Sequence, residues 1–265
     1  MRPTLPVLAT LAVLLLPAPA MSAAAPSADM SAFLAAVSRA YGGRAALDRI
    51  DSYRLEGSVF SSMRHTEART VRVWARPDRF KAIVDYDQHP EGRVANGGDV
   101  WRNEPGGPLE PATGPMRAAV MLQAARAGVP WTLLAHAADA HFLRDEPPPI
   151  PVKIQVDGAP ARLVAIEVAL GDGLRLRVWA DSLGRIRVSQ GLMESGPMRT
   201  HFETFYDDFR ESAGVAFACR ELNWASGTQT GITTVQRVTV NPPLRADEFL
   251  PSAAGDSTHG GRGER

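Results

Sequence analysis

Apolar and polar residues alternate along most of this chain, and such alternation is typical of β-strands that bury one face. It is clearest in the runs 53–59, 80–86 and 174–180. Short turns rich in glycine and aspartate separate neighbouring runs, as at Gly171-Asp172-Gly173. Because neither half of the chain has a helical pattern between its strands, the sequence predicts antiparallel pairing and not parallel βαβ units.

One exception to the alternation precedes the first strand. Residues 31–48 follow the helical period and place Phe33, Val37 and Tyr41 on one face. Gly42-Gly43 interrupts the segment, so we expect a helix that ends there, followed by a short helical turn.

The second exception, Pro111–Leu143, lies between the two strand-rich halves. In the helix predicted over 116–127, Arg117 and Arg126 point to opposite sides at about 100° per residue, so no broad polar face exists. Gly128-Val129-Pro130 separates this helix from a second apolar run. A helix without a polar face must be covered on several sides, and a sheet is the only large partner that the chain offers.

These patterns predict an α+β protein. We expect a curved antiparallel sheet that forms an open, incomplete β-barrel, with helices plugging or lidding its hollow. A chain of 265 residues, of which 45% are hydrophobic, can bury a sizeable core. We therefore expect a single domain over 26–250.

The two ends of the chain differ from this domain. A basic start at Arg2 and an apolar run over 5–16 are typical of a secretory signal peptide, and the run is too short to span a bilayer. We expect 1–25 to be cleaved and the protein to be periplasmic, with neither a transmembrane helix nor a lipid anchor, since no cysteine lies near the cleavage region. The segment 251–265 is predicted to be disordered.

Charge and cysteine content exclude further classes. The chain has 29 basic and 29 acidic residues, and this balance argues against a nucleic acid as partner. Cys219 is the only cysteine, so no intramolecular disulfide forms. Its apolar surroundings predict a small buried hydrophobic residue and not a nucleophile.

The motifs of common enzymes are absent: the sequence has no G-x-S-x-G, no Walker loop and no dinucleotide fingerprint. The pair His136 and His141 is better explained as a solvated helix end than as a metal site. His201 and Glu203 are better explained as a solvated strand face than as an acid–base pair. We expect no enzyme, metal or cofactor, and a hydrolase using these histidines is the minor alternative.

Several stretches, in the right order, resemble the LolA/LolB-like family of periplasmic lipoprotein carriers. Val73–Phe80 is similar to that family's strand-Arg-Pro-turn-strand, and Tyr206–Val215 to its Tyr-x-Asp-Phe-Arg stretch. The other matching stretches are Tyr41–Leu47, Val94–Trp101, Trp179–Ile186 and Val240–Phe249. The resemblance implies an open β-barrel whose apolar hollow holds acyl chains under a helical lid. It also implies that Arg76 helps to hold the lid closed.

We therefore expect a lipid, an acyl chain or a lipoprotein in an apolar hollow, for carriage or sensing in the cell envelope. A membrane-bound donor or acceptor protein would exchange the cargo, and we expect a monomer. The alternative is a non-catalytic envelope scaffold with a filled core. The expected ligand-binding residues are Arg76, Phe80, Val84, Trp101, Met116, Val120, Met121, Leu122, Trp131, Val164, Ile166, Leu174, Leu176 and Val178.

Overall fold

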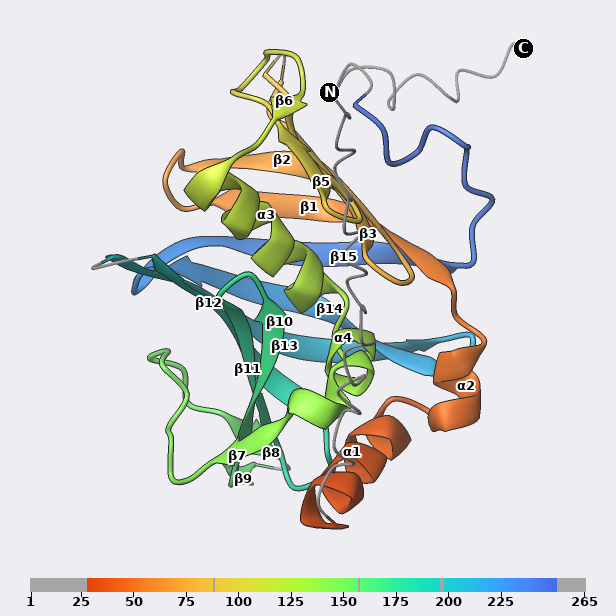
Figure 1. Ribbon diagram of the computed structural model, residues 1–265, viewed down its shortest axis with the longest axis vertical. Helices are drawn as coiled ribbons and strands as arrows, with labels where there is room; N and C mark the ends of the chain where they lie inside the picture. Colours follow the sequence, from red (N-terminus) through yellow and green to blue (C-terminus); the bar gives the residue numbers. More distant parts are fainter. Residues whose placement is uncertain (1–27, 88, 157, 196–197, 252–265) are drawn as a thin grey trace, which may run out of the picture.

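The computed structural model describes residues 28–87, 89–156, 158–195 and 198–251. Its first part, red to yellow in Figure 1, has two short helices followed by a meander of strands. These elements are α1 (Ala28–Ala40), α2 (Arg44–Asp48), β1 (Ser52–Ser61), β2 (Thr66–Ala75), β3 (Arg79–Asp85), β4 (Glu91–Asn96), β5 (Asp99–Arg102) and β6 (Glu110–Pro111).

The second part begins with the helical insert and continues with strands to the C-terminus. The insert consists of α3 (Gly114–Ala127), α4 (Trp131–Ala135) and the 3₁₀ turn η1 (Ala137–Asp139). The strands are β7 (His141–Leu143), β8 (Gln155–Val156), β9 (Ala159–Pro160), β10 (Val164–Gly171), β11 (Leu174–Ala180), β12 (Ile186–Ser195), β13 (Met198–Ser212), β14 (Val215–Ala225) and β15 (Thr228–Val240).

All strands except β8 and β9 form one antiparallel sheet, in the order β6-β5-β4-β3-β2-β1-β15-β14-β13-β12-β11-β10-β7. The last strand joins the two meanders, because β15 pairs with β1 in a register that sets Tyr53 opposite Val240. In the described chain the edge strands β6 and β7 do not pair with each other, so the sheet curves without closing. This confirms the predicted α+β fold with an open antiparallel sheet.

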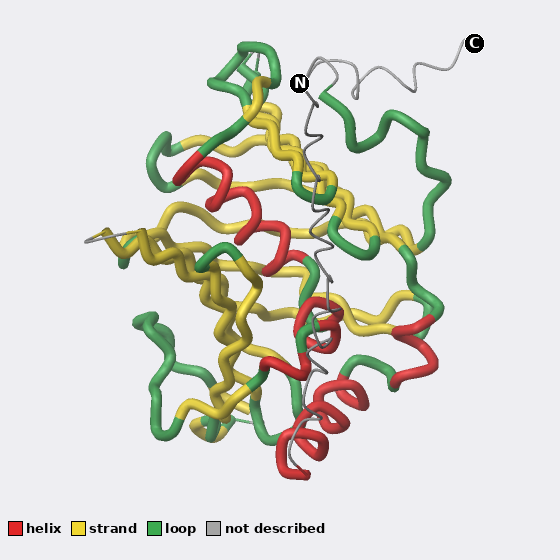
Figure 2. The backbone as a smooth tube through the Cα atoms, viewed as in Figure 1, coloured by secondary structure: helices red, strands yellow, loops and turns green. Residues whose placement is uncertain are grey.

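The helix α3 lies across the hollow of the curved sheet (Figure 2). It contacts β3, β4 and β5 on one side and β11 and β12 on the other. From Arg117 to Ala127 every residue is buried or half-buried, as expected for a helix without a polar face. None of the described helices is both long and apolar enough to span a membrane.

The remaining helices cover the inner face of the sheet, which is the face toward α3. Met30, Leu34 and Val37 of α1 pack with Leu47 of α2 and Leu133 of α4 in the largest apolar cluster. On the sheet side this cluster includes Ile166, Leu176, Val178 and Cys219. Cys219 is 2% exposed, which confirms that it is a buried hydrophobic residue.

The outer face of the sheet is also covered, by two segments with little regular structure. Ile150 and Ile154, from the connector between β7 and β10, pack on Trp179 and Phe205. The segment after β15 places Phe249 on another part of the outer face, against Val73, Ala75 and Val94. Strands β2 to β4 and β10 to β14 therefore include positions that are buried on both faces.

The sequence of the connector predicts that a strand over 153–156 turns directly into a strand that starts at Arg162. In the structure, β8 and β9 instead form a separate two-stranded sheet, and β10 begins at Val164. The expected signal peptide at 1–25, and the expected disordered tail apart from Pro251, lie outside the described residues.

Candidate ligand-binding cavity

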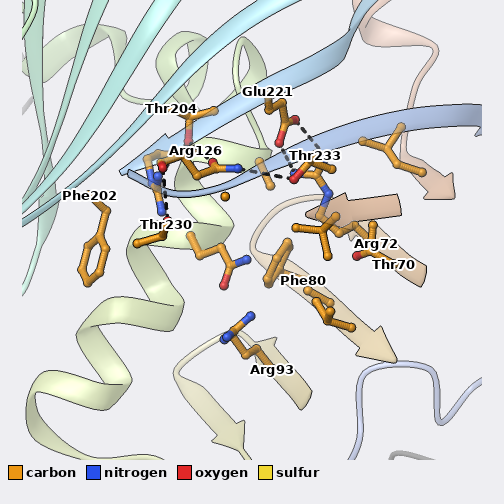
Figure 3. A pocket seen from close by; sticks show the side chains of 18 of the residues that line it. Thr70, Arg72, Phe80, Arg93, Arg126, Phe202, Thr204, Glu221, Thr230 and Thr233 are labelled. Carbon is orange, nitrogen blue, oxygen red and sulfur yellow. Dashed lines mark hydrogen bonds and ion pairs between the residues drawn. The ribbon is translucent and has the colours of Figure 1, made fainter. Parts of the chain in front are cut away.

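A cavity of about 760 Å³ lies between α3 and the inner face of the sheet. Its walls come from α3, from β1 to β5 and from β13 to β15. This volume falls in the range of about 300–1,000 Å³ that is usual for sites holding one small molecule. Figure 3 shows the lining side chains converging on this space from both meanders.

One wall of the cavity is apolar. It is formed by Phe80, Ala82 and Val84 at alternate positions of β3, opposite Met116 and Val120 of α3. Phe80 and Val120 are 0% and 2% exposed and belong to one packed cluster, whereas Met116 is 50% exposed. The wall thus runs from a buried interior at Phe80 and Val120 to an exposed end at Met116.

An aromatic cluster closes the cavity toward α4. The rings of Tyr53 and Trp74 stack with their centroids 5.4 Å apart, and Trp131 of α4 lies 5.1 Å from Trp74. Phe217 meets Tyr53 edge-on at 5.3 Å. Tyr53, Trp74 and Phe217 line the cavity, whereas Trp131 packs behind them.

The rest of the lining is mixed and includes many polar and charged side chains, in contrast to the apolar hollow expected from the sequence. Five arginines and two glutamates are among the described lining residues, an excess of three positive charges. Threonines and one asparagine stand between them. The arginines are Arg64, Arg72, Arg93, Arg102 and Arg126.

Arg72 and Glu221 form an ion pair in the interior. The Arg72 guanidinium donates two hydrogen bonds of 2.8 Å to the Glu221 carboxylate, and both side chains are largely buried. Burial on its own would lower the pKa of Arg72, but Glu221 raises it above the usual value. The Nε atom of Arg72 is buried and has no hydrogen-bond partner among the described residues.

Arg126 lies beside this pair and has no carboxylate partner in the described chain. Its guanidinium donates to the Thr204 hydroxyl at 2.8 Å (Figure 3) and to the Leu122 carbonyl at 3.2 Å. It also lies 5.7 Å from the centre of the Phe202 ring. Burial lowers the pKa of Arg126.

Three further arginines lie where β4 and β5 meet the turn between β1 and β2, and two of them bind the same glutamate. Glu91 accepts a hydrogen bond from Arg64 with one oxygen and from Arg93 with the other, the latter at 3.1 Å. Arg102 stands opposite Arg93 in the β4–β5 pairing. Its nearest carboxylate partner, Glu104, is 3.7 Å away and outside the cavity lining.

The position of α3 over the cavity is fixed at its C-terminal end. The last carbonyl groups of a helix lack intrahelical hydrogen-bond donors, and here tyrosine hydroxyls of the sheet act as the donors. The Tyr53 hydroxyl donates to the Ala127 carbonyl, and the Tyr206 hydroxyl donates to the Arg126 carbonyl at 3.1 Å. Leu122 packs so closely on Gly191 of β12 that a Cβ at that glycine would lie 2.9 Å from the Leu122 Cβ.

Four of the expected ligand-binding residues line the cavity: Phe80, Val84, Met116 and Val120. The others lie outside its lining. Ile166, Leu176, Val178 and Trp131 pack in the cluster under α1 and α4, whereas Met121, Leu122 and Leu174 lie between α3 and the sheet. Trp101 packs on the outer face near Phe249, and Val164 is 38% exposed.

Arg76 also lies outside the lining and connects three elements. Its guanidinium donates at 2.7 Å to the Leu47 carbonyl in the last turn of α2. The indole nitrogen of Trp131 donates to the same carbonyl at 3.1 Å. One backbone oxygen thus ties the Arg-Pro turn after β2 to both α2 and α4.

The interior arginines of the cavity were missed in the sequence. The alternation in β2 offers two faces, Val71-Val73-Ala75 and Thr70-Arg72-Trp74, and the apolar one suggests the interior. In the structure the polar face lines the cavity, because Phe249 covers the apolar one. The one available signal was a charged residue on one face of a strand that is otherwise largely buried, such as Arg72 in β2.

The polar pair at His201 and Glu203 also differs from expectation. Glu203 is fully buried and accepts hydrogen bonds from His201 and from Gln190, the latter at 2.9 Å, so the strand face is not solvated there. The described residues contain no group of three or more His, Cys, Asp and Glu side chains suited to a metal ion.

No protein-family model matches the chain, and no curated protein matches it either. Several solved structures, however, are similar to it. A domain classed as an outer membrane lipoprotein-sorting protein from Vibrio parahaemolyticus has 12% identity and a TM-score of 0.51, covering 83% of this chain and 97% of its own. A LolA superfamily protein from Nitrosomonas europaea has 12% identity and a TM-score of 0.50, covering 83% and 96%.

A third structure, a DUF1329 family protein from Desulfovibrio piger, has 12% identity and a TM-score of 0.50, with 85% and 98% covered. At such identities the likeness establishes the fold. The chain therefore has a LolA-like fold, as the resemblance in its sequence predicted, with a cavity of mixed apolar and cationic lining between the helical insert and the sheet.

Proposed function

We propose that this protein is a periplasmic, non-catalytic carrier or sensor that holds a lipid, an acyl chain or the acyl chains of a lipoprotein in the cavity beneath α3. The cavity itself is the observation that carries the proposal, since it leaves about 760 Å³ between the insert and the sheet. Of the solved structures with this fold, one is described as an outer membrane lipoprotein-sorting protein domain and one as a LolA superfamily protein. These descriptions support the role of a lipid or lipoprotein carrier.

The apolar wall supplies the binding energy in this account. A chain lying along Phe80, Val84 and Val120 would gain about 0.8 kcal/mol for each CH₂ group removed from water. Because Met116 is half-exposed at the N-terminal end of α3, this end is the proposed entrance, while the tyrosine contacts hold the other end.

Release requires the insert to move. Displacing α3 would expose Val120 and Leu122, which are almost fully buried, so we propose that a membrane-bound donor or acceptor takes part in the exchange. The hydrogen bond from Arg76 to the Leu47 carbonyl holds α2 and α4 in the closed arrangement. Arg76 is therefore proposed as the latch.

The alternative is an envelope scaffold that binds nothing in the cavity. The cationic lining argues against this alternative, because buried arginines without full pairing are costly in a purely structural core. The two functions predict different masses for the protein isolated from cells.

Native mass spectrometry of the mature protein, taken gently from the periplasm and followed by solvent extraction, separates these functions. A carrier shows a stoichiometric extra mass that extracts as lipid. Ala119→Trp, which places a large ring in the cavity, is expected to remove that mass while circular dichroism stays unchanged. Ala32→Trp on the exposed side of α1 is the matched control. A bare chain that also fails to bind added phospholipid or lipopeptide would support the scaffold.

A further inference from the structure

We propose that the cargo is an anionic amphiphile, whose carboxylate or phosphate head is held by an arginine cluster formed by Arg64, Arg93 and Arg102. This inference rests on the proposed function and names the chemical class of the molecule that the cavity takes. It concerns the polar end of the cavity, where the three side chains are each about one-third exposed.

The arginine cluster is electrostatically incomplete. Arg93 and Arg102 occupy directly opposite positions on β4 and β5, and like charges in such pairs repel. Glu91 is the sole acidic side chain within the described lining at this end, and its two oxygens are already engaged by Arg64 and Arg93. Glu104, the partner of Arg102, is 78% exposed and 3.7 Å away. The cluster thus keeps positive charge that a bound anion would neutralise.

The pKa of Arg93 points the same way. Burial lowers this pKa, and Arg102 lowers it further, while Glu91 raises it. The protein alone therefore under-stabilises the charged form of Arg93. An oxyanion between Arg93 and Arg102 would supply the missing stabilisation, and guanidinium groups suit carboxylate and phosphate oxygens through paired N–H donors.

The surroundings favour an amphiphile over a small free anion. Arg93 stands opposite Ala82 in the β3–β4 pairing, next to the apolar stripe of Phe80 and Val84. Figure 3 shows the Arg93 side chain reaching into the cavity below Phe80. A head group bound here leaves its chain against the apolar wall, whereas a free anion would gain nothing from that wall.

The first test compares, on the mature wild-type protein, two probes of the same chain length but different head groups with two free anions. Dissociation constants for myristate, myristyl alcohol, acetate and inorganic phosphate are measured by tryptophan fluorescence, because Trp74 lines the cavity. Myristate should bind about 10- to 100-fold more tightly than the alcohol, as expected for a charge-assisted hydrogen bond. That preference should shrink with added salt.

The second test replaces the arginines. Arg93→Gln and Arg102→Gln should each weaken myristate binding about tenfold and leave alcohol binding unchanged. Arg237→Gln is the matched control, because Arg237 is exposed on β15 and absent from the lining. Each variant removes one positive charge, so an effect of net charge alone would appear in all three.

Each outcome decides between the two proposals. Equal binding of myristate and the alcohol by the wild-type protein would overturn the anionic cargo while the carrier function stands. Acetate or phosphate binding as tightly as myristate would overturn the amphiphile and indicate a site for free anions. Failure of every chain-bearing probe to bind would overturn the carrier function itself.

Discussion

At the scale of single residues, Gly128 shows how tightly the insert is packed on the sheet. A Cβ at this position would lie 2.5 Å from the Thr132 hydroxyl oxygen and 2.6 Å from the indole nitrogen of Trp74. Gly128→Ala is therefore expected to lower the free energy of unfolding by about 1–3 kcal/mol, as overpacking does. Urea denaturation measures the loss.

Gly98 gives the matched control for that substitution. It lies in the turn between β4 and β5, and a Cβ there would meet nothing within 4 Å. Gly98→Ala should change the free energy of unfolding by less than about 0.5 kcal/mol. Equal effects of the two substitutions would show that the turn at Gly128 does not pack on Trp74 as the structure places it.

Buried tyrosines make the stability of the protein depend on alkaline pH. Burial raises the pKa of Tyr41, Tyr53 and Tyr206 above the ordinary value of 10.0, to about 12 for Tyr206. Above pH 10 the unfolded chain loses phenolic protons that the native chain keeps. The free energy of unfolding should therefore fall by up to about 1.4 kcal/mol per pH unit for each of these tyrosines.

Urea unfolding at a series of pH values above and below 10, followed by tyrosinate absorbance, measures this effect. Below pH 10 both states keep the phenolic protons, so these groups add no pH dependence. Tyr53→Phe should reduce the alkaline slope, because it removes one of the three groups. An unchanged slope in that variant would contradict the raised pKa.

At the scale of the element, α3 has two roles that separate along its length. Leu122 of α3 is fully buried against Leu174 and Met193 and does not line the cavity. Met116 is half-exposed and does line it. Leu122→Ala is expected to lower the free energy of unfolding by about 2–5 kcal/mol, whereas Met116→Ala should change it by less than about 0.5 kcal/mol.

The effects of the two substitutions on ligand binding should have the opposite order. Met116→Ala is expected to weaken the binding of an acyl probe, because it removes apolar surface at the entrance. Denaturation and fluorescence titration on both variants test the separation. If Met116→Ala destabilised the fold as much as Leu122→Ala, α3 would be core along its whole length.

The elements themselves were predictable where one physical pattern dominates. The apolar α3 and the break at Gly128-Val129-Pro130 followed from the lack of a polar face and from turn chemistry. The strands β1, β3 and β11 followed from alternation and turns. The pairing of β8 with β9 could not be predicted from the sequence, since strands of two residues carry no periodic signal.

At the scale of the whole molecule, the open sheet was predictable but the cavity lining was not. Alternation tells which residues share a face, but it does not tell which face turns inward when both are covered. The inner position of Arg72 depends on Phe249, which lies far away in the sequence and covers the outer face of β2. The sequence therefore predicted Phe80, Val84, Met116 and Val120 as lining residues but missed Arg72, Arg93 and Arg126.

The central claim is that an acyl chain lies between α3 and β3. Photo-crosslinking tests it most directly, using a myristate analogue with a diazirine at the end of its chain and mapping the adducts by mass spectrometry. The account predicts adducts on Phe80, Val84, Met116 or Val120 that excess unlabelled myristate removes. Adducts confined to exposed apolar side chains outside the cavity, such as Leu183 and Leu250, would contradict it.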